Sequence, residues 1–201
     1  MEIKKTIDDF YFLNYDYLDK DEPELKIVRF YLSLFLKYFT PKIVKKFKSW
    51  GDLMDFLDKT LNLNQYYYSA SSDKYMKSNN IKWFSNKIDT VKVFGCNIYM
   101  CKLKIIDPYI VECRGNYYNE LPIQQDVYKF YDDNIMVDTF DTDNYVEYVL
   151  EINKIKPTYK CIIFKNIFEG NGNTKISDVV VPLDNSLITV FHKHNICKPD
   201  F

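Results

Sequence analysis

The second half of this chain consists of short segments rich in valine, isoleucine, tyrosine and phenylalanine, separated by glycine, proline, asparagine or aspartate. β-Branched and aromatic residues are enriched in strands, and turn-forming residues at such intervals mark strand ends. The pattern therefore predicts that residues 91–201 form mostly β structure. The strand-like segments are residues 91–106, 145–152, 159–168 and 178–183. Turns are expected near residues 115–119, 141–144, 156–157 and 170–173.

The first half contains a largely apolar and aromatic run, Leu25–Phe39. Hydrophobic periodicity alone does not separate a buried strand from a helix in such a run. Because residues 27–31 are mostly β-branched or aromatic, we interpret the first part of the run as a strand. We expect the run to end at Thr40 and Pro41.

A helix is predicted over residues 50–61. Ser49 followed by Asp52 gives a capping pattern, and the apolar residues from Trp50 to Leu61 recur at helical spacing. Residues 62–90 are polar around clusters of tyrosine and tryptophan, which indicates a loop with one strand.

These elements predict one α+β domain over residues 1–201, with an N-terminal strand and helix packed on a largely antiparallel sheet. Its first half, residues 1–90, is helical and aromatic, and its second half, residues 91–201, is rich in strands. The sequence contains no internal repeat and no Gly/Ser-rich linker between the halves.

Charge and hydropathy limit the classes of partner. The 27 basic and 28 acidic side chains leave a formal net charge of -1, so a site for nucleic acid must be a local one. The longest apolar run, residues 27–36, is roughly half the ~20 residues that a membrane-spanning helix needs. Asp8 and Asp9 interrupt the place where a signal peptide would be apolar. We therefore expect a cytoplasmic protein with no membrane partner.

The five cysteines are sparse and odd in number, which is untypical of a disulfide framework. We interpret them as reduced thiols, in agreement with a cytoplasmic location. They stand at positions 96, 101, 113, 161 and 197.

The composition indicates the origin of the chain rather than its chemistry. It has 18 tyrosines and 15 phenylalanines but only 5 glycines and a single alanine, Ala70. The first pair is encoded by AT-rich codons and the second by GC-rich codons. An AT-rich genome is expected, such as that of a large cytoplasmic DNA virus, a protist or a low-GC bacterium.

Two short motifs carry weak chemical signals. The segment 170–175 has glycines near a threonine and a lysine but lacks the residue order of a phosphate-binding P-loop, so we predict a hairpin turn. His192, His194 and Cys197 are types that ligate zinc, but no fourth ligand is evident. We interpret that segment as a polar tail, with metal binding left open. Because both histidines lie there, we nominate no catalytic residue, no cofactor and no dinucleotide site.

Acidic residues concentrate between Asp132 and Asp143, with Glu147 and Glu151 beyond. Carboxylates hold hard cations such as magnesium, so a metal-dependent hydrolase is one hypothesis. A contiguous acidic run is more typical of a solvated loop, which is the interpretation we favour.

The segment 66–87 interleaves aromatic rings with lysines. Rings stack on bases for ~1 to 3 kcal/mol each, and lysines neutralise phosphates. Tyr75, Lys82, Trp83 and Lys87 are therefore candidate RNA ligands. The alternative is that Tyr67, Tyr75 and Trp83 close the hydrophobic core over the predicted helix.

Residues 29–113 resemble the cap-binding translation initiation factors of the 4E type in their pattern. That family begins with an aromatic strand, comparable with residues 29–35, and continues with a helix that opens Phe-x-[ST], comparable with Phe47-Lys48-Ser49. An isoleucine followed closely by a tryptophan comes next, as in Ile81-Lys82-Trp83. The family binds methylated guanine between two tryptophans, with an acid at the base edge and basic residues on the phosphates.

The resemblance implies that Trp83 is one stacking ring and that Tyr38 or Phe39 replaces the other. Phe84 stands where the acid of the family follows the tryptophan, so RNA binding without selection for the methylated base stays open. The leading hypothesis is a non-enzymatic cytoplasmic protein that binds RNA, in its most specific form at the 5′ cap. The rivals are a viral accessory protein that binds a host protein, and the metal-dependent hydrolase.

Overall fold

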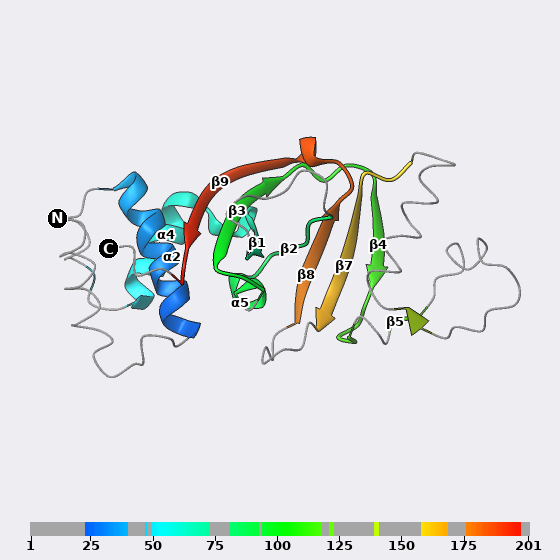
Figure 1. Ribbon diagram of the computed structural model, residues 1–201, viewed down its shortest axis with the longest axis horizontal. Coiled ribbons are helices and arrows are strands. Elements are labelled where there is room, and N and C mark those ends of the chain that lie inside the picture. The colour runs from blue at the N-terminus through cyan, green and yellow to red at the C-terminus, as the bar shows by residue number, and fades with distance from the viewer. Residues whose placement is uncertain are drawn as a thin grey trace, which may run out of the picture. The chain divides into compact units, whose positions relative to one another are not determined.

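A computed structural model of the chain describes residues 23–39, 47, 50–72, 81–92, 94–117, 121–122, 139–140, 158–168 and 176–197. Its helices are α2 (Pro23–Tyr38), α4 (Trp50–Leu61) and α5 (Ile88–Val91), with 3₁₀ turns η1 (Leu63–Gln65) and η3 (Asn185–Leu187). Its strands are β1 (Tyr67–Ser71), β2 (Phe84–Ser85), β3 (Asn97–Leu103), β4 (Pro108–Glu112), β5 (Leu121–Pro122), β6 (Thr139–Phe140), β7 (Cys161–Phe168), β8 (Ile176–Pro182) and β9 (Ile188–Asn195) (Figure 1). The predicted α+β class is confirmed.

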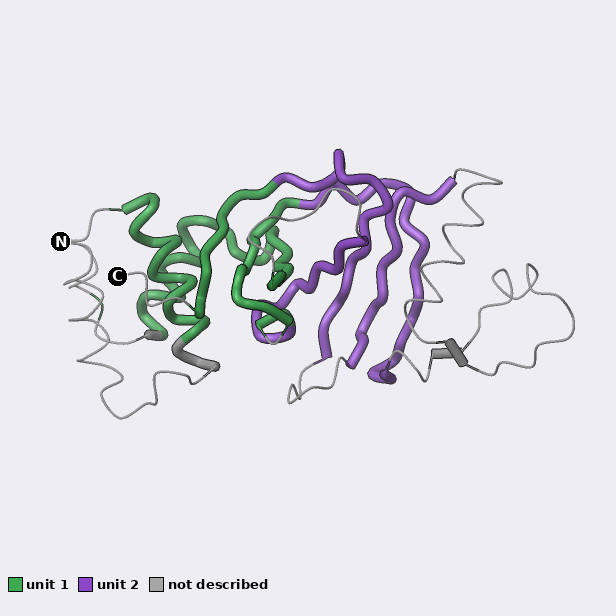
Figure 2. The backbone as a smooth tube through the Cα atoms, viewed as in Figure 1, with its two compact units in different colours: residues 1–76, 91–102, 190–201 green, residues 77–90, 103–189 purple. Residues whose placement is uncertain are grey.

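The chain divides into two compact units (Figure 2). Unit 1 takes residues 1–76, 91–102 and 190–201, and unit 2 takes residues 77–90 and 103–189. The boundary near residue 90 between the helical first half and the strand-rich second half does not coincide with the border between the units. The chain leaves unit 1 twice and returns to it twice. The single domain over residues 1–201 stays a prediction.

Residues 23–38 form one helix, so the strand interpretation of the first part of the apolar run is wrong. Four polar residues, Lys26, Arg29, Ser33 and Lys37, recur at intervals of three and four and lie on one side of a helix. Burial of a wide apolar helix face outweighs the strand propensity of residues 27–31. The fully buried side chains of α2 include Phe30, Leu32, Leu34 and Phe35.

Helix α4 confirms the helix predicted over residues 50–61. Its Leu53 and Leu57 are fully buried, as their spacing predicted. Its Phe56 joins a cluster of phenylalanine rings around Phe35 of α2. The ring centroid of Phe35 lies 4.9 Å from that of Phe39, 5.8 Å from that of Phe47 and 6.0 Å from that of Phe56.

Unit 1 carries β1, β3 and most of β9, in that order. Strand β1 pairs antiparallel with β3, with Tyr67 opposite Cys101 and Ser71 opposite Asn97. The polar-tail interpretation of residues 192–197 is wrong, because β9 runs to Asn195 and the side chains of His192 and Ile196 are buried.

Helix α2 covers the outer edge of β9, the last strand of that order. Arg29 Nη1 donates to the carbonyl oxygen of Ile196 at 3.4 Å, and Lys37 Nζ donates to that of Phe191 at 2.8 Å. An edge strand that keeps unpaired backbone groups invites pairing with other chains, so such a cover protects it. The polar side of α2 therefore holds the C-terminal strand.

Unit 2 carries β4, β7, β8 and β2, in that order. The pairs β7–β8 and β8–β2 are antiparallel and β4–β7 is parallel, which agrees with the predicted, largely antiparallel sheet. Strands β7 and β8 confirm the predictions for residues 159–168 and 178–183, whereas β4 was not predicted. Residues 62–90 contain two strands, β1 and β2, where one was expected.

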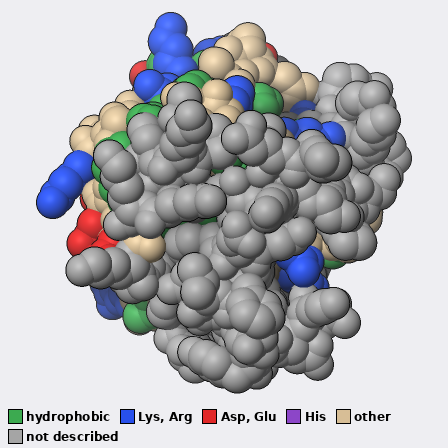
Figure 3. Space-filling view, turned by 90° about the vertical axis from the view of Figure 1, so that its left-hand side faces the viewer, with side chains coloured by type: hydrophobic (Ala, Val, Ile, Leu, Met, Phe, Trp, Pro, Cys, Tyr) green, Lys and Arg blue, Asp and Glu red, His purple; other side chains and the backbone are tan. Residues whose placement is uncertain are grey.

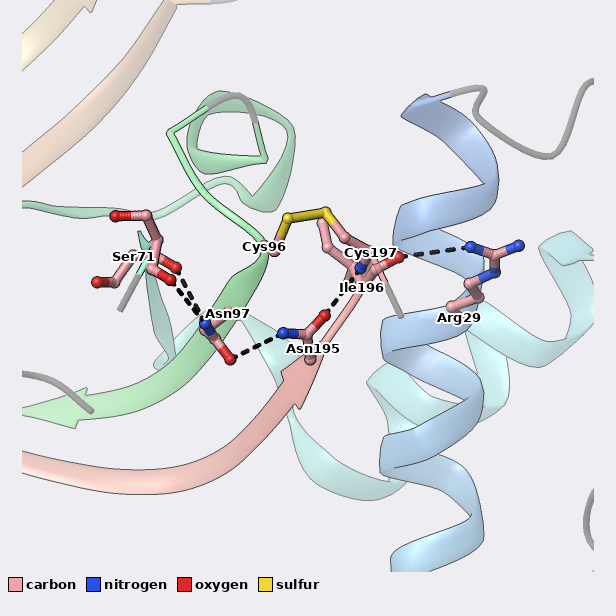
Figure 4. Close-up of a disulfide and its surroundings, with 8 residues drawn as sticks. Arg29, Ser71, Cys96, Asn97, Asn195, Ile196 and Cys197 are labelled. Carbon is pink, nitrogen blue, oxygen red and sulfur yellow. Dashed lines mark hydrogen bonds between the residues drawn. A yellow bond between two sulfur atoms is a disulfide. The ribbon is translucent and has the colours of Figure 1, made fainter. Parts of the chain in front are cut away.

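Cys96 and Cys197 form a disulfide across 101 residues of sequence (Figure 4). The interpretation of all five cysteines as reduced thiols is therefore wrong for this pair, while Cys101, Cys113 and Cys161 are free and buried. The two sulfurs meet because β9 returns beside β3 at the end of the chain. Cysteine spacing alone carries no information about such a contact.

Asparagine side chains join the strands of unit 1 next to this disulfide (Figure 4). Asn195 Nδ2 donates to Asn97 Oδ1 at 3.2 Å, and Asn97 Nδ2 donates to the carbonyl oxygen of Ser71 at 3.3 Å. Cys197 N donates to Asn195 Oδ1 at 3.1 Å. The ends of β1, β3 and β9 are therefore fixed to one another by both hydrogen bonds and a covalent link.

Candidate nucleic-acid interface

Three aromatic side chains of unit 1 pack in a row: Tyr38 at the end of α2, Phe191 in β9 and Tyr66 just before β1. The first pair of rings is stacked, and the second pair is tilted by 38°. The rings of Tyr38 and Phe191 lie 11° from parallel with centroids 5.2 Å apart, and the centroids of Phe191 and Tyr66 are 4.7 Å apart. Tyr38 is 41% exposed, whereas Tyr66 is buried. We call these three residues the aromatic row; its solvent-exposed end is Tyr38.

Two lysines carry their charge close to the aromatic row. Lys37 Nζ lies 5.1 Å from the ring centroid of Tyr38 and 5.6 Å from that of Phe191, and Lys102 Nζ lies 5.2 Å from that of Tyr66. A cation within about 6 Å of a ring face is attracted to the ring. The row therefore combines an exposed ring with two ammonium groups able to neutralise phosphate.

Charged residues in the described part of unit 1 are predominantly basic, although the whole chain is nearly neutral. Lysine and arginine side chains are more prominent than acidic ones among the coloured atoms of the face in Figure 3. The basic residues are Lys26, Arg29, Lys37, Lys59, Lys92, Lys102 and Lys193, and the acidic ones are Glu24, Asp52, Asp55 and Asp58.

The position of Tyr38 follows from the way α2 ends. Lys37 stands in the last turn of the helix, where a cation complements the helix dipole, and its ammonium group donates to the carbonyl of Phe191. This hydrogen bond ties the end of α2 to β9 at the point where the two rings meet. It therefore fixes the stacking of Tyr38 on Phe191.

Ser33 and His192 form a serine–histidine pair that the sequence did not indicate. Ser33 Oγ lies 2.9 Å from His192 Nε2 and donates to the carbonyl oxygen of Phe30 at 2.6 Å. With the serine proton directed to that carbonyl, we interpret Nε2–H as the donor in the contact between Ser33 and His192. A general base must instead accept the serine proton. The His192 ring is buried against Phe30, with centroids 5.2 Å apart. The pair is therefore structural.

Burial of His192 predicts a loss of stability in mild acid. Burial, with the nearby charges of Lys37 and His194, lowers its pKa from 6.5 to about 3. The unfolded chain therefore binds one more proton between these values, and stability falls as the pH falls through them. From pH 7 to pH 5 the expected loss from this group is about 2 kcal/mol of unfolding free energy.

Urea unfolding at pH 7 and pH 5 measures this loss. The variant His192→Gln is expected to lose the extra pH dependence, whereas His194→Gln should keep it. Equal pH dependence in the wild type and His192→Gln would contradict the prediction.

The residues nominated around Trp83 belong to unit 2. The half-buried indole stacks on the buried ring of Phe164, with centroids 5.7 Å apart. Lys82 is buried, its Nζ donates to Asn185 Oδ1 at 2.6 Å, and burial lowers its pKa. Lys87 Nζ donates to the carbonyl oxygen of Ile176. Each nominated lysine thus donates to a protein acceptor, as Lys37 also does, but only Lys82 is buried as well.

Among the other nominated residues, Tyr38 and Phe39 belong to unit 1. Tyr38 heads the aromatic row, and Phe39 stacks on Phe35 inside the phenylalanine cluster. Tyr75 lies outside the described residues. The same holds for Ser49, the segment 170–175, the predicted strand 145–152 and the acidic residues Asp132, Asp133, Asp138, Asp141, Asp143, Glu147 and Glu151.

Metal ligation was left open for the C-terminal histidines and cysteine. The sulfur of Cys197 is bonded to Cys96, so it is not a thiolate ligand in this form of the chain. Within the described ranges, no three His, Cys, Asp or Glu side chains gather as a metal site. Burial raises the pKa of the Cys101 and Cys113 thiols to about 12, which makes them poor nucleophiles.

Comparison with protein-family models, curated proteins and solved structures gives no match to this chain. Of the helices in the described residues, none has the length and apolar character needed to cross a membrane.

Sequence reasoning missed Phe191, Tyr66 and the two lysines of the row. A signal for Phe191 existed, because residues 188–191 (ITVF) are β-branched and aromatic and favour a strand. No sequence signal predicts that Phe191 contacts Tyr38. The neighbouring residue, Lys37, is 154 positions away from Phe191.

Proposed function

We propose that this chain is a non-enzymatic binding protein that takes single-stranded RNA on the aromatic row. The observation that carries the proposal is the exposed ring of Tyr38, stacked on Phe191 and flanked by the ammonium group of Lys37. Proteins that bind single strands combine rings for the bases with positive charge for the backbone. Lys102 and the basic excess among the described residues of unit 1 supply further positive charge.

Recognition of the methylated 5′ cap is the narrower form of this proposal. It is supported by the resemblance of residues 29–113 to the 4E-type factors and by the partly exposed indole of Trp83. Phe84, at the position where that family has its acid, is a fully buried phenylalanine. RNA binding without cap selection is therefore the form that we favour.

Fluorescence anisotropy with a labelled ten-nucleotide RNA tests the proposal. Tyr38→Ala is expected to weaken binding by about 1 to 3 kcal/mol, because one base loses its stacking partner. Lys102→Ala should weaken binding and flatten its salt dependence. Tyr117→Ala is the matched control, since Tyr117 is 42% exposed and belongs to unit 2.

Two outcomes would count against RNA binding at the row. One is the absence of binding at 100 µM RNA, and the other is an equal loss in Tyr38→Ala and Tyr117→Ala. Competition by a cap analogue but not by unmethylated RNA would instead favour the narrower, cap-specific form.

A second candidate, binding of a host protein, is favoured by an apolar cluster in unit 2. Tyr117 and Ile176 are 42% and 44% exposed, the Tyr117 ring packs edge-on against Phe168 at 4.7 Å, and Phe168 is paired with Ile176 across the strands. Exposed aromatic and aliphatic side chains are typical of interface cores. A pulldown that survives RNase and is lost in Tyr117→Ala would favour this function.

A further inference from the structure

Strand β9 reaches unit 1 at the end of a long excursion of the chain. Residues 103–189 belong to unit 2, and residues 190–201 then return to unit 1. Without a covalent link, this segment is an edge strand held by hydrogen bonds and side-chain packing. These include Lys37 to Phe191, Arg29 to Ile196 and Asn195 to Asn97. Residues at the edge of a sheet and near a chain end open more easily than core strands.

The Cys96–Cys197 disulfide is the covalent link that prevents this opening (Figure 4). It joins the residue before β3 to the second residue after β9, next to the backbone hydrogen bond from Ile196 N to Cys96 O at 2.8 Å. It therefore closes the end of β9 that lies farthest from the aromatic row.

The disulfide is also accessible to reductants. Cys197 is exposed and Cys96 is half-buried, whereas Cys101, Cys113 and Cys161 are buried. Thiol–disulfide exchange begins when a thiolate attacks an accessible disulfide sulfur. Because one residue of this disulfide is exposed, we expect a reductant in solution to react with it before it reaches the three buried thiols.

We propose that the Cys96–Cys197 disulfide is a redox-sensitive latch that keeps β9, and with it Phe191 of the aromatic row, in unit 1. A soluble dithiol opens the latch. Its thiolate attacks Cys197 Sγ, breaks the bond to Cys96 Sγ and releases the Cys96 thiolate. Its second thiolate then attacks the dithiol's own sulfur in the mixed disulfide and releases the Cys197 thiolate. The protein gains two electrons and two protons as two thiols, and the dithiol leaves as a cyclic disulfide. The effect on RNA rests on the function proposed above.

Opening the latch acts on RNA binding through Phe191. When β9 separates from α2, Tyr38 loses the ring that it stacks on and Lys37 loses its backbone acceptor. The exposed ring is then no longer held in one orientation, so stacking a base on it costs more conformational entropy. Oxidised protein is therefore expected to bind RNA more tightly than reduced protein.

Hydrogen exchange and RNA anisotropy, each with and without dithiothreitol, test the latch on the full chain. Reduction is expected to speed amide exchange of residues 190–196 at least tenfold and to weaken RNA binding about tenfold. The double variant Cys96→Ser/Cys197→Ser should match the reduced wild type and should not respond to dithiothreitol.

The two readouts separate failure of the latch from failure of the proposed function. Unchanged exchange in residues 190–196 after reduction would overturn the latch, whatever RNA does. Faster exchange with equal RNA affinity in both forms would overturn the link between the latch and the aromatic row. Faster exchange after reduction, with no RNA binding by either the oxidised or the reduced protein, would support the latch on β9 but contradict the proposed function.

Discussion

Replacing both Cys96 and Cys197 by serine is expected to lower the free energy of unfolding by about 4 kcal/mol. The disulfide closes a loop of 101 residues, and a long loop gains conformational freedom in the unfolded chain when its crosslink is removed. Apart from the backbone, this disulfide is the only covalent link between the C-terminal strand and the rest of unit 1 in the described residues, and the double variant removes it.

Urea unfolding of the oxidised wild type, the reduced wild type and the double variant measures this loss. The last two should unfold at the same urea concentration, well below the first. The double variant lacks the disulfide, so its midpoint with and without reductant controls for any other effect of the reductant. Coinciding midpoints for oxidised and reduced protein would contradict the prediction.

Gly95→Ala is expected to cost about 3 kcal/mol of stability, at the upper end of the range for overpacked sites. A Cβ at this position would lie 2.3 Å from the carbonyl carbon of Ser71 and 2.6 Å from Ser72 N. These are backbone atoms, which cannot rotate away as a side chain can. To make room, the end of β1 must leave β3 and break the hydrogen bond from Asn97 to Ser71.

Gly51→Ala is the matched control for this substitution. Gly51 is an exposed residue in the first turn of α4, where alanine has the higher helix propensity. It is expected to be neutral or to stabilise the protein by up to about 1 kcal/mol. Thermal unfolding of both variants gives the comparison, and a Gly95→Ala protein as stable as Gly51→Ala would show that Ser71 and Ser72 do not confine this position.

The disulfide bears on the cellular location expected from the sequence. Persistent disulfides are typical of oxidising compartments, whereas disulfides of the cytosol are mostly transient or regulatory. The cytoplasmic location stays a prediction, and it agrees with the latch rather than with a permanent crosslink. A thiol-trapping assay on freshly lysed source cells would distinguish the two.

Local patterns were sufficient where one segment decides its own structure. Residues 50–61 carry a helical spacing of apolar residues, and α4 follows it. Residues 159–168 and 178–183 are short, β-branched and aromatic, and β7 and β8 follow them. The strand prediction for the first part of the run 25–39 was wrong. Its residue types favour a strand, but its polar residues recur at helical spacing, at positions 26, 29, 33 and 37.

The candidate site was predictable only in part. Tyr38 was nominated, and it is the exposed end of the aromatic row. Lys82 was nominated for its charge, but its ammonium group donates to Asn185 Oδ1. A long lysine side chain can turn toward the protein interior when a polar acceptor lies within its reach. Residue type does not reveal which way a long side chain points.

The sequence by itself determined the α+β class, the helix at 50–61 and strands β7 and β8, because propensity and periodicity act over a few neighbouring residues. Only the tertiary structure decided that the polar side of α2 holds β9, that Phe191 lies under Tyr38 and that Cys96 bonds to Cys197. Those contacts join residues roughly 100 or more positions apart. They form because unit 1 buries apolar surface from three separate segments at once, and no local pattern encodes that choice.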